Sequence, residues 1–228
     1  KQWRFPSAQI HEWVSTQMSS PLVPVTAATD QQVPRDRGQS GEIDELVSLL
    51  PLSCVQLIQD SHADLLGVML VVTDMDGNPI TEPSRPCGLF STINKNPDAL
   101  QRCISSWHDL GQGLNIEPEF HKSHLGLLCA RGLIRVGTEL KGMVVAGCVA
   151  PEIWPPENDE LAEMAKGFGV PPTLLKARLH EVYHLNFQQK STVLNTVQKV
   201  ANIVAHIVNE RLELVGRLDA IADLALAR

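Results

Sequence analysis

About the last 40 residues of the chain carry its most regular pattern of hydrophobic positions. Written in heptads, residues 188–228 hold apolar side chains at three positions. The d positions are Val193, Val200, Ile207, Leu214 and Ile221; the a positions are Val197, Val204, Arg211, Leu218 and Ala225; the e positions are Leu194, Ala201, Val208, Val215 and Ala222. This pattern predicts one long amphipathic helix whose wide apolar stripe needs a partner, and a homodimer is the simplest one. Arg211, the polar exception, would set the register. The alternative is a helix that folds back onto its own domain.

Residues 42–187 show shorter patterns that predict an α+β domain with an antiparallel sheet and flanking helices. The predicted helices are Glu42–Leu50, Cys54–Leu66, a helix capped by Asn96 and begun by Pro97 that runs to Leu110, Glu157–Lys166 and Pro172–Tyr183. The predicted strands are Val68–Thr73, turned by Asp76-Gly77 into Asn78–Thr81, and Ala130–Val136 with Lys141–Val149 around Gly137-Thr138.

The amino-terminal segment differs in composition from the rest. Residues 19–41 are rich in Ser, Pro, Thr, Gln and Asp, which predicts a solvated linker. Before it, residues 1–18 read as a short strand and an amphipathic helix with Ile10, Trp13 and Val14 on one face. The run Gln-Trp-Arg-Phe-x-x-Ser-x-x-Ile-x-x-Trp-Val resembles the last hairpin strand and closing helix of excisionase-type, MerR-related helix-turn-helix domains. The resemblance implies DNA-reading helices upstream of Lys1, so we expect the chain to be a piece of a longer protein.

Composition narrows the function classes. The 228 residues are 43% hydrophobic, and 19 Lys plus Arg against 26 Asp plus Glu give a net charge of −7. That sign does not suit a surface coated by nucleic acid or by an anionic membrane. The longest apolar run is far too short for a membrane span. An odd set of five cysteines without C-x-x-C spacing favours a reducing cytoplasm over a disulfide framework.

One motif points to metal catalysis. His180-Glu181-Val182-Tyr183-His184 matches H-E-x-x-H, in which two His one helical turn apart bind zinc and the Glu acts as base. A zinc hydrolase is therefore an alternative function. Its third ligand would have to be Glu210, which falls on the long helix at a position that does not suit it. The alternative is a purely structural role for the motif at an exposed helix end. There the His side chains would interact favourably with the negative, carboxyl-terminal end of the helix dipole.

The central Cys and His residues are the other candidates for chemistry. Cys87, Cys103, Cys129, His121 and His124 lie between the two predicted hairpins. A thiol or metal sensor built on Cys87, Cys103 and His124 is a further alternative, although isolated Cys residues, including Cys148, are more often small core side chains. The sequence shows no Ser/His/Asp order and no glycine loop for phosphates, so it predicts neither an enzyme nor a cofactor.

Four motifs in this region resemble the PocR-type sensory domain. They are Val71-Val72-Thr-Asp-Met-Asp-Gly-Asn-Pro-Ile-Thr-Glu-Pro-Ser, Asn96-Pro-Asp-Ala-Leu-Gln-Arg-Cys103, Ser123-His124-Leu-Gly-Leu127 and Leu140-Lys-Gly-Met-Val-Val-Ala-Gly147. The resemblance implies a PAS-like module that senses small organic molecules such as diols, in transcription regulators and other signalling proteins. Members usually carry Cys where Phe90 stands, another at Cys103, and a Cys-His pair where this chain has Ser123-His124. Two of these three cysteines are missing here, which points to a differently lined pocket.

These observations predict the effector-sensing and dimerising part of a one-component transcription regulator. Its DNA contact would come from the absent amino-terminal domain. Cys103 and Trp107 share one face of the helix begun by Pro97, and His124 leads into the next hairpin. We expect a small, partly polar organic ligand to contact Phe90, Cys103, Trp107, His121 and His124 in a cavity between this helix and the sheet.

Overall fold

A computed structural model of the chain describes residues 50–226. The helix-turn-helix resemblance of residues 1–18, the linker predicted for 19–41 and all but the last residue of the helix predicted for Glu42–Leu50 lie outside these residues. Within the described part, no helix is both long and apolar enough to cross a membrane.

Four antiparallel strands form the single sheet of the described residues. They are β1 (Met69–Asp74), β2 (His121–Lys122), β3 (Leu128–Val136) and β4 (Glu139–Val149), and their order is β1-β4-β3-β2. The α+β class and both predicted core hairpin strands, β3 and β4, are confirmed. The strand β2 was not predicted, because two residues are too few to show an alternating pattern.

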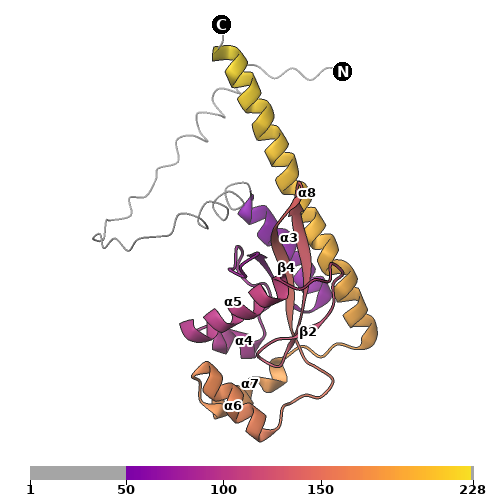
Figure 1. The fold of residues 1–228 in the computed structure, drawn as a ribbon. Coiled ribbons are helices and arrows are strands. Elements are labelled where there is room, and N and C mark those ends of the chain that lie inside the picture. The colour runs from indigo at the N-terminus through magenta and orange to yellow at the C-terminus, as the bar shows by residue number, and fades with distance from the viewer. Residues whose placement is uncertain (1–49, 227–228) are drawn as a thin grey trace, which may run out of the picture. The chain divides into compact units, whose positions relative to one another are not determined.

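Helices cover both faces of the sheet (Figure 1). On one face lie α3 (Leu52–Leu66) and the first half of α8 (Phe187–Leu226). The core on the other face takes in α4 (Gly88–Ile93), α5 (Pro97–Gly111), α6 (Asn158–Phe168), α7 (Pro172–Arg178) and the short 3₁₀ helix η1 (Leu179–Glu181). Strand β1 serves both cores: Met69 and Val71 face the second, and Leu70 and Val72 face the first.

The turn after β1 reverses the chain, as Asp76-Gly77 predicts. The Asp74 N–H donates to the Asn78 carbonyl at 3.0 Å, but the returning segment pairs with β1 only through isolated bridges. The Val72 N–H donates to the side chains of Gln59 and Thr81 instead of to the backbone of that segment. A Cβ on Gly77 would lie 2.4 Å from the Ile104 carbonyl oxygen. Only glycine therefore lets this turn lie against the backbone of α5.

Helix α8 begins as part of the domain core. Its residues Val193, Val197, Val200, Val204 and Val208 are buried against the sheet and α3. The fold-back alternative therefore describes this half of the apolar stripe. Beyond Val208 the helix continues away from the sheet, and its apolar side chains become exposed: Leu214, Val215, Leu218, Ile221 and Leu224.

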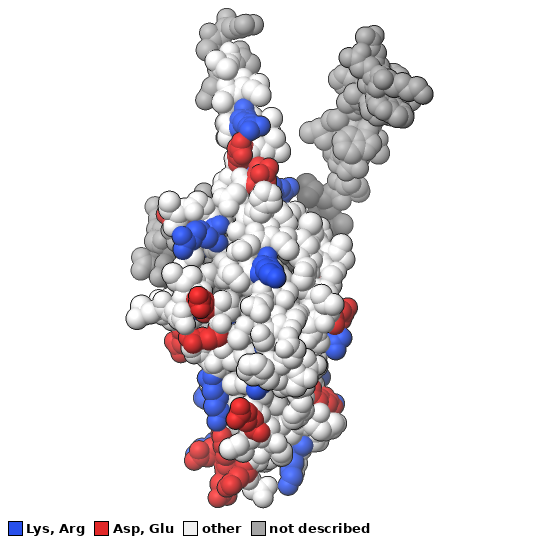
Figure 2. Space-filling model, turned by 90° about the vertical axis from the view of Figure 1, so that its right-hand side faces the viewer, with Lys and Arg blue, Asp and Glu red and all other residues white. Residues whose placement is uncertain are grey.

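The outer face of α8 is sparsely charged where it covers the sheet. Lys199 is the one Lys, Arg, Asp or Glu between Lys190 and Glu210. Figure 2 shows this side of the molecule, with both signs of charge on the projecting end of the helix and a largely uncharged middle. Glu213 and Arg217 form an ion pair on that projecting end.

Candidate ligand pocket

Helix α5 presents two different faces to its surroundings. The Asn96 side chain accepts a hydrogen bond from the Asp98 N–H at 3.1 Å, and Pro97 occupies the first turn, so the predicted start of the helix is confirmed. Its buried face carries Ala99, Cys103, Trp107 and Leu110. A neighbouring polar face carries Arg102, Ser105, Ser106 and Asp109, spaced three, four and seven residues after the first. The helix therefore separates an apolar interior from a polar pocket.

The apolar side of α5 forms an inner cavity with α4 and the sheet. The Phe90 and Trp107 rings stack with centroids 6.1 Å apart, and the Cys103 Sγ lies 4.0 Å from the His124 Nε2. Four of the five predicted ligand residues, Phe90, Cys103, Trp107 and His124, thus surround one cavity. Its free volume is only about 10 Å³, which suffices for about one water molecule. In this structure, side chains fill the place where the sequence predicts a ligand.

An open outer pocket of about 530 Å³ adjoins this cavity. The polar face of α5 forms one wall, and the segment from β2 to the start of β3 forms the other. The lining residues are Arg102, Ser105, Ser106, Asp109, Leu110, Gly113, His121, Lys122, Ser123, His124 and Cys129. His121, the fifth predicted residue, lies here and not in the inner cavity. Ser106, Ser123, His124 and Cys129 line both spaces and form the partition between them.

The sequence-based site omitted most of the outer pocket. Arg102, Ser105 and Asp109 repeat at helical spacing, but such a polar stripe on a helix ordinarily indicates a solvated face. The Ser123 Oγ is buried, and in the described part of the chain its only partner is the Cys129 thiol, which is a weak one. No sequence signal marks that hydroxyl beyond its place beside His124.

The four buried cysteines lie near one another: Cys129 belongs to the partition, and Cys87, Cys103 and Cys148 lie behind it. Burial raises the pKa of Cys103 to about 12 and that of Cys129 to about 11. A hydrogen bond with the Cys148 thiol lowers the pKa of Cys87, while burial raises the pKa of Cys148 well above its usual value. Cys103 and Cys129 are therefore protonated at neutral pH, which disfavours their use as nucleophiles.

Cys148 owes its position to an irregularity in β4. Its backbone φ is +63°, and the strand register shifts opposite it, between Leu128 and Ala130. Cys148 consequently lines the inner cavity, and a Cβ on the preceding Gly147 would also lie on that side of the sheet, 3.3 Å from the Cys129 sulfur.

His124 stands at the mouth of the partition, near Arg102. Its ring lies 5.3 Å from the Phe168 ring, and desolvation together with the charge of Arg102 lowers its pKa.

We expect the His124 ring to titrate below about 6.5 in nuclear magnetic resonance spectra. Because the unfolded chain would take up this proton at higher pH, His124 makes folding less stable as the pH falls through about 6.5. Arg102→Gln should raise the pKa of His124, and Arg135→Gln, on the far part of β3, should leave it unchanged.

The H-E-x-x-H motif does not form the arrangement that zinc catalysis requires. Helix α7 ends at Arg178, the 3₁₀ helix ends at Glu181, and Val182 is extended, so His180 and His184 do not share a helix face. The predicted helix to Tyr183 is wrong in this last part. Tyr183 instead pairs with the end of β4, its N–H donating to the Cys148 carbonyl at 2.9 Å.

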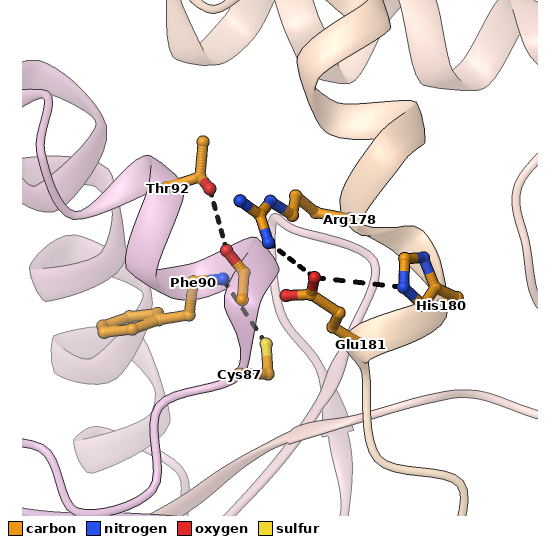
Figure 3. Close-up of polar contacts among 7 residues, drawn as sticks. Cys87, Phe90, Thr92, Arg178, His180 and Glu181 are labelled. Atoms are coloured by element: carbon orange, nitrogen blue, oxygen red, sulfur yellow. Dashed lines mark hydrogen bonds and ion pairs between the residues drawn. The ribbon is translucent and has the colours of Figure 1, made fainter.

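Glu181 is engaged in packing. Its carboxylate pairs with Arg178 at 2.6 Å and points toward the start of α4 (Figure 3). A Cβ on Gly88 would lie 1.2 Å from a Glu181 carboxylate oxygen, so the carboxylate occupies the space that this glycine leaves open. Among residues 50–226 no three His, Cys, Asp or Glu side chains are grouped to hold a metal ion.

Comparison with known proteins identifies one family. Residues 48–209 match the family described as "Sensory domain found in PocR", which covers most of the chain, including α3, the whole sheet and the buried half of α8. No curated protein and no solved structure gave a match. With its antiparallel sheet, its helices on both faces and its family match, the chain belongs to the PocR-type sensory domain family.

Proposed function

We propose that the domain senses a small organic molecule in the outer pocket and transmits its presence through β3 to α8. The observation that carries this proposal is the position of the pocket. Cys129 of β3 forms part of its lining, and α8 packs on the opposite face of the same strand. His121 and His124 contact the ligand directly, whereas Phe90, Cys103 and Trp107 support the partition from behind.

The contacts between β3 and α8 are close enough to couple the two elements. The side-chain amide of Gln198 donates to the Leu133 carbonyl and accepts from the Leu133 N–H, each at 3.0 Å. A Cβ on Gly132 would lie 2.5 Å from the Val197 carbonyl oxygen, so the strand and helix backbones almost touch. A displacement of β3 must therefore move α8 or break these contacts.

The same strand also reaches the wall of the pocket. The buried Arg131 guanidinium donates to the carbonyls of Gly113 and Asn115, at 2.6 and 3.0 Å. Gly113 lines the outer pocket. A ligand that moves the segment from Gly113 to Asn115 therefore acts on β3 through Arg131 as well as through Cys129. Such a ligand shifts the equilibrium between two conformations of the domain only as far as its affinities for the two conformations differ.

Thermal unfolding against a panel of small diols, polyols, organic acids and amides tests the sensing proposal. A compound that binds only the folded domain raises its unfolding temperature. We expect Ser105→Trp, which fills the outer pocket, to abolish the shift given by a binding compound. Gln101→Trp, one turn earlier on α5 and outside the pocket lining, should retain it. Equal shifts in both variants would place the binding site elsewhere.

The exposed end of α8 is proposed to form a homodimer with a second copy of the chain. Its apolar side chains Leu214, Leu218 and Ile221 continue the heptad positions that fill the core earlier in the same helix. Coupling to DNA would follow if the upstream segment is the helix-turn-helix domain that residues 1–18 resemble. A ligand-dependent change in α8 would then alter the spacing of two DNA-binding domains.

We expect Leu218→Asp to raise the dimer dissociation constant at least about tenfold, because the dimer would bury an unpaired charge. Asn195→Asp adds the same charge to an exposed position of α8 beside the sheet and serves as the matched control. Sedimentation equilibrium measures both. A wild-type chain that stays monomeric, or equal effects of the two variants, would refute this dimer.

A further inference from the structure

The polar side chains that line the outer pocket carry mainly hydrogen-bond donors. Arg102, Lys122 and three serines, at positions 105, 106 and 123, can all donate hydrogen bonds. Among the described residues of the lining Asp109 is the one carboxylate, and it lies seven residues after Arg102, about 10 Å further along the axis of α5. The end of the pocket near Arg102 therefore has more donors than acceptors.

The two positively charged side chains of the lining, Arg102 and Lys122, differ in their ion pairs. Among the described residues Arg102 makes no ion pair, although it lines the pocket of a chain with a net charge of −7. Lys122 pairs with Glu160 at 3.4 Å, but both side chains are more than half exposed. An ion pair of this kind contributes little to stability, so Lys122 can exchange it for another anion.

Ser123 supplies an independent observation. Among residues 50–226 its buried Oγ has only the Cys129 thiol as a weak partner, and the residue lines both the outer pocket and the inner cavity. A thiol is a weak hydrogen-bond partner, so a stronger acceptor would stabilise this buried hydroxyl. The inner cavity is too small for more than a water molecule, so an organic partner for this hydroxyl must enter from the outer pocket.

We propose that the ligand is a small monocarboxylic acid whose carboxylate binds between Arg102, Lys122 and the Ser123 hydroxyl. Its apolar part lies against Leu110 and Cys129. A carboxylate offers acceptors only, which matches the surplus of donors. Arg102 and Lys122 against Asp109 leave one positive charge in the lining, which favours a monoanion. This inference rests on the proposed sensing function and specifies its ligand class.

Titration calorimetry with propanoate, butanoate and benzoate, each beside its primary amide, tests the ligand class. The amides have nearly the same shape without the charge, and 1,2-propanediol serves as a neutral diol. We expect at least one acid to bind about tenfold or more tightly than its amide, as charge-assisted hydrogen bonds allow. Equal affinities for acid and amide, or no binding by any of the acids, would overturn the inference.

Variants then locate the carboxylate. Arg102→Gln should weaken binding of the acid at least about tenfold, and Ser123→Ala should weaken it severalfold. Arg135→Gln removes an exposed arginine outside the pocket and should change the affinity less than twofold. Since Arg102 is exposed, circular dichroism should show Arg102→Gln folded like the wild type. Equal effects of Arg102→Gln and Arg135→Gln would overturn the inference.

The two proposals fail in different ways. If the diol or an amide binds in the outer pocket while the acids do not, the sensing function stands and the acid ligand is wrong. If an acid binds but Ser105→Trp leaves its affinity unchanged, the outer pocket is not the sensing site and both proposals fail.

Discussion

We expect a chain that ends at Gln189 to lose its cooperative thermal unfolding transition. Such a chain lacks the five valines of α8 that are buried on the sheet: Val193, Val197, Val200, Val204 and Val208. At about 1.5 kcal/mol for each buried side chain, they contribute about 7.5 kcal/mol. That is comparable with the whole free energy of unfolding of an ordinary domain, about 5–15 kcal/mol. Circular dichroism during heating is the measurement.

A chain that ends at Glu213 provides the control. It keeps every buried residue of α8 and removes most of the exposed apolar stripe. Its unfolding temperature should stay within a few degrees of the full chain, while sedimentation should show a monomer. If the chain ending at Gln189 unfolds cooperatively at the same temperature, α8 is not part of the domain core. If the chain ending at Glu213 still dimerises, the dimer uses another surface.

The second large effect concerns Trp107. Its side chain is 3% exposed and stacks on Phe90, so Trp107→Ala should lower the free energy of unfolding by about 3–5 kcal/mol. The inner cavity is too small for a ligand in this structure, and the truncation would therefore leave a new void in packed core. Urea denaturation followed by circular dichroism gives the value.

Trp107→Phe keeps an aromatic ring against Phe90 and should cost clearly less. A loss below about 1 kcal/mol for Trp107→Ala, together with altered ligand binding, would show that Trp107 lines a ligand space and not the core. This outcome would return the ligand to the inner cavity.

Local sequence signals predicted the elements whose stability is local. Asn96 and Pro97 begin α5 as expected, and the apolar runs around Gly137 form β3 and β4. The predicted helix through His180 and Tyr183 failed at its end for a nonlocal reason. Tyr183 hydrogen-bonds through its backbone with Cys148 and Ala150 at the end of β4, and this tertiary pairing outweighs local helix preference.

The candidate site was predicted in part for the same reason. Spacing on α5 brought Cys103 and Trp107 to one face, and the structure places Phe90 and His124 beside them. Spacing could not show that Phe90 and Trp107 fill most of the space between them. Nor could it show that Arg102 and Asp109 border a pocket, because a polar stripe has the same pattern whether water or another segment faces it.

The continuity of α8 has a mechanical consequence. The helix runs unbroken from the sheet to Leu226, so the segment after Val208 extends roughly 27 Å beyond its last buried valine. A rigid rod of that length is a lever whose fulcrum is the contact with β3. A tilt of about 10° at the fulcrum displaces the tip sideways by roughly 5 Å. A change at the pocket too small to alter the fold can therefore become a sideways displacement of several ångströms at the tip of α8.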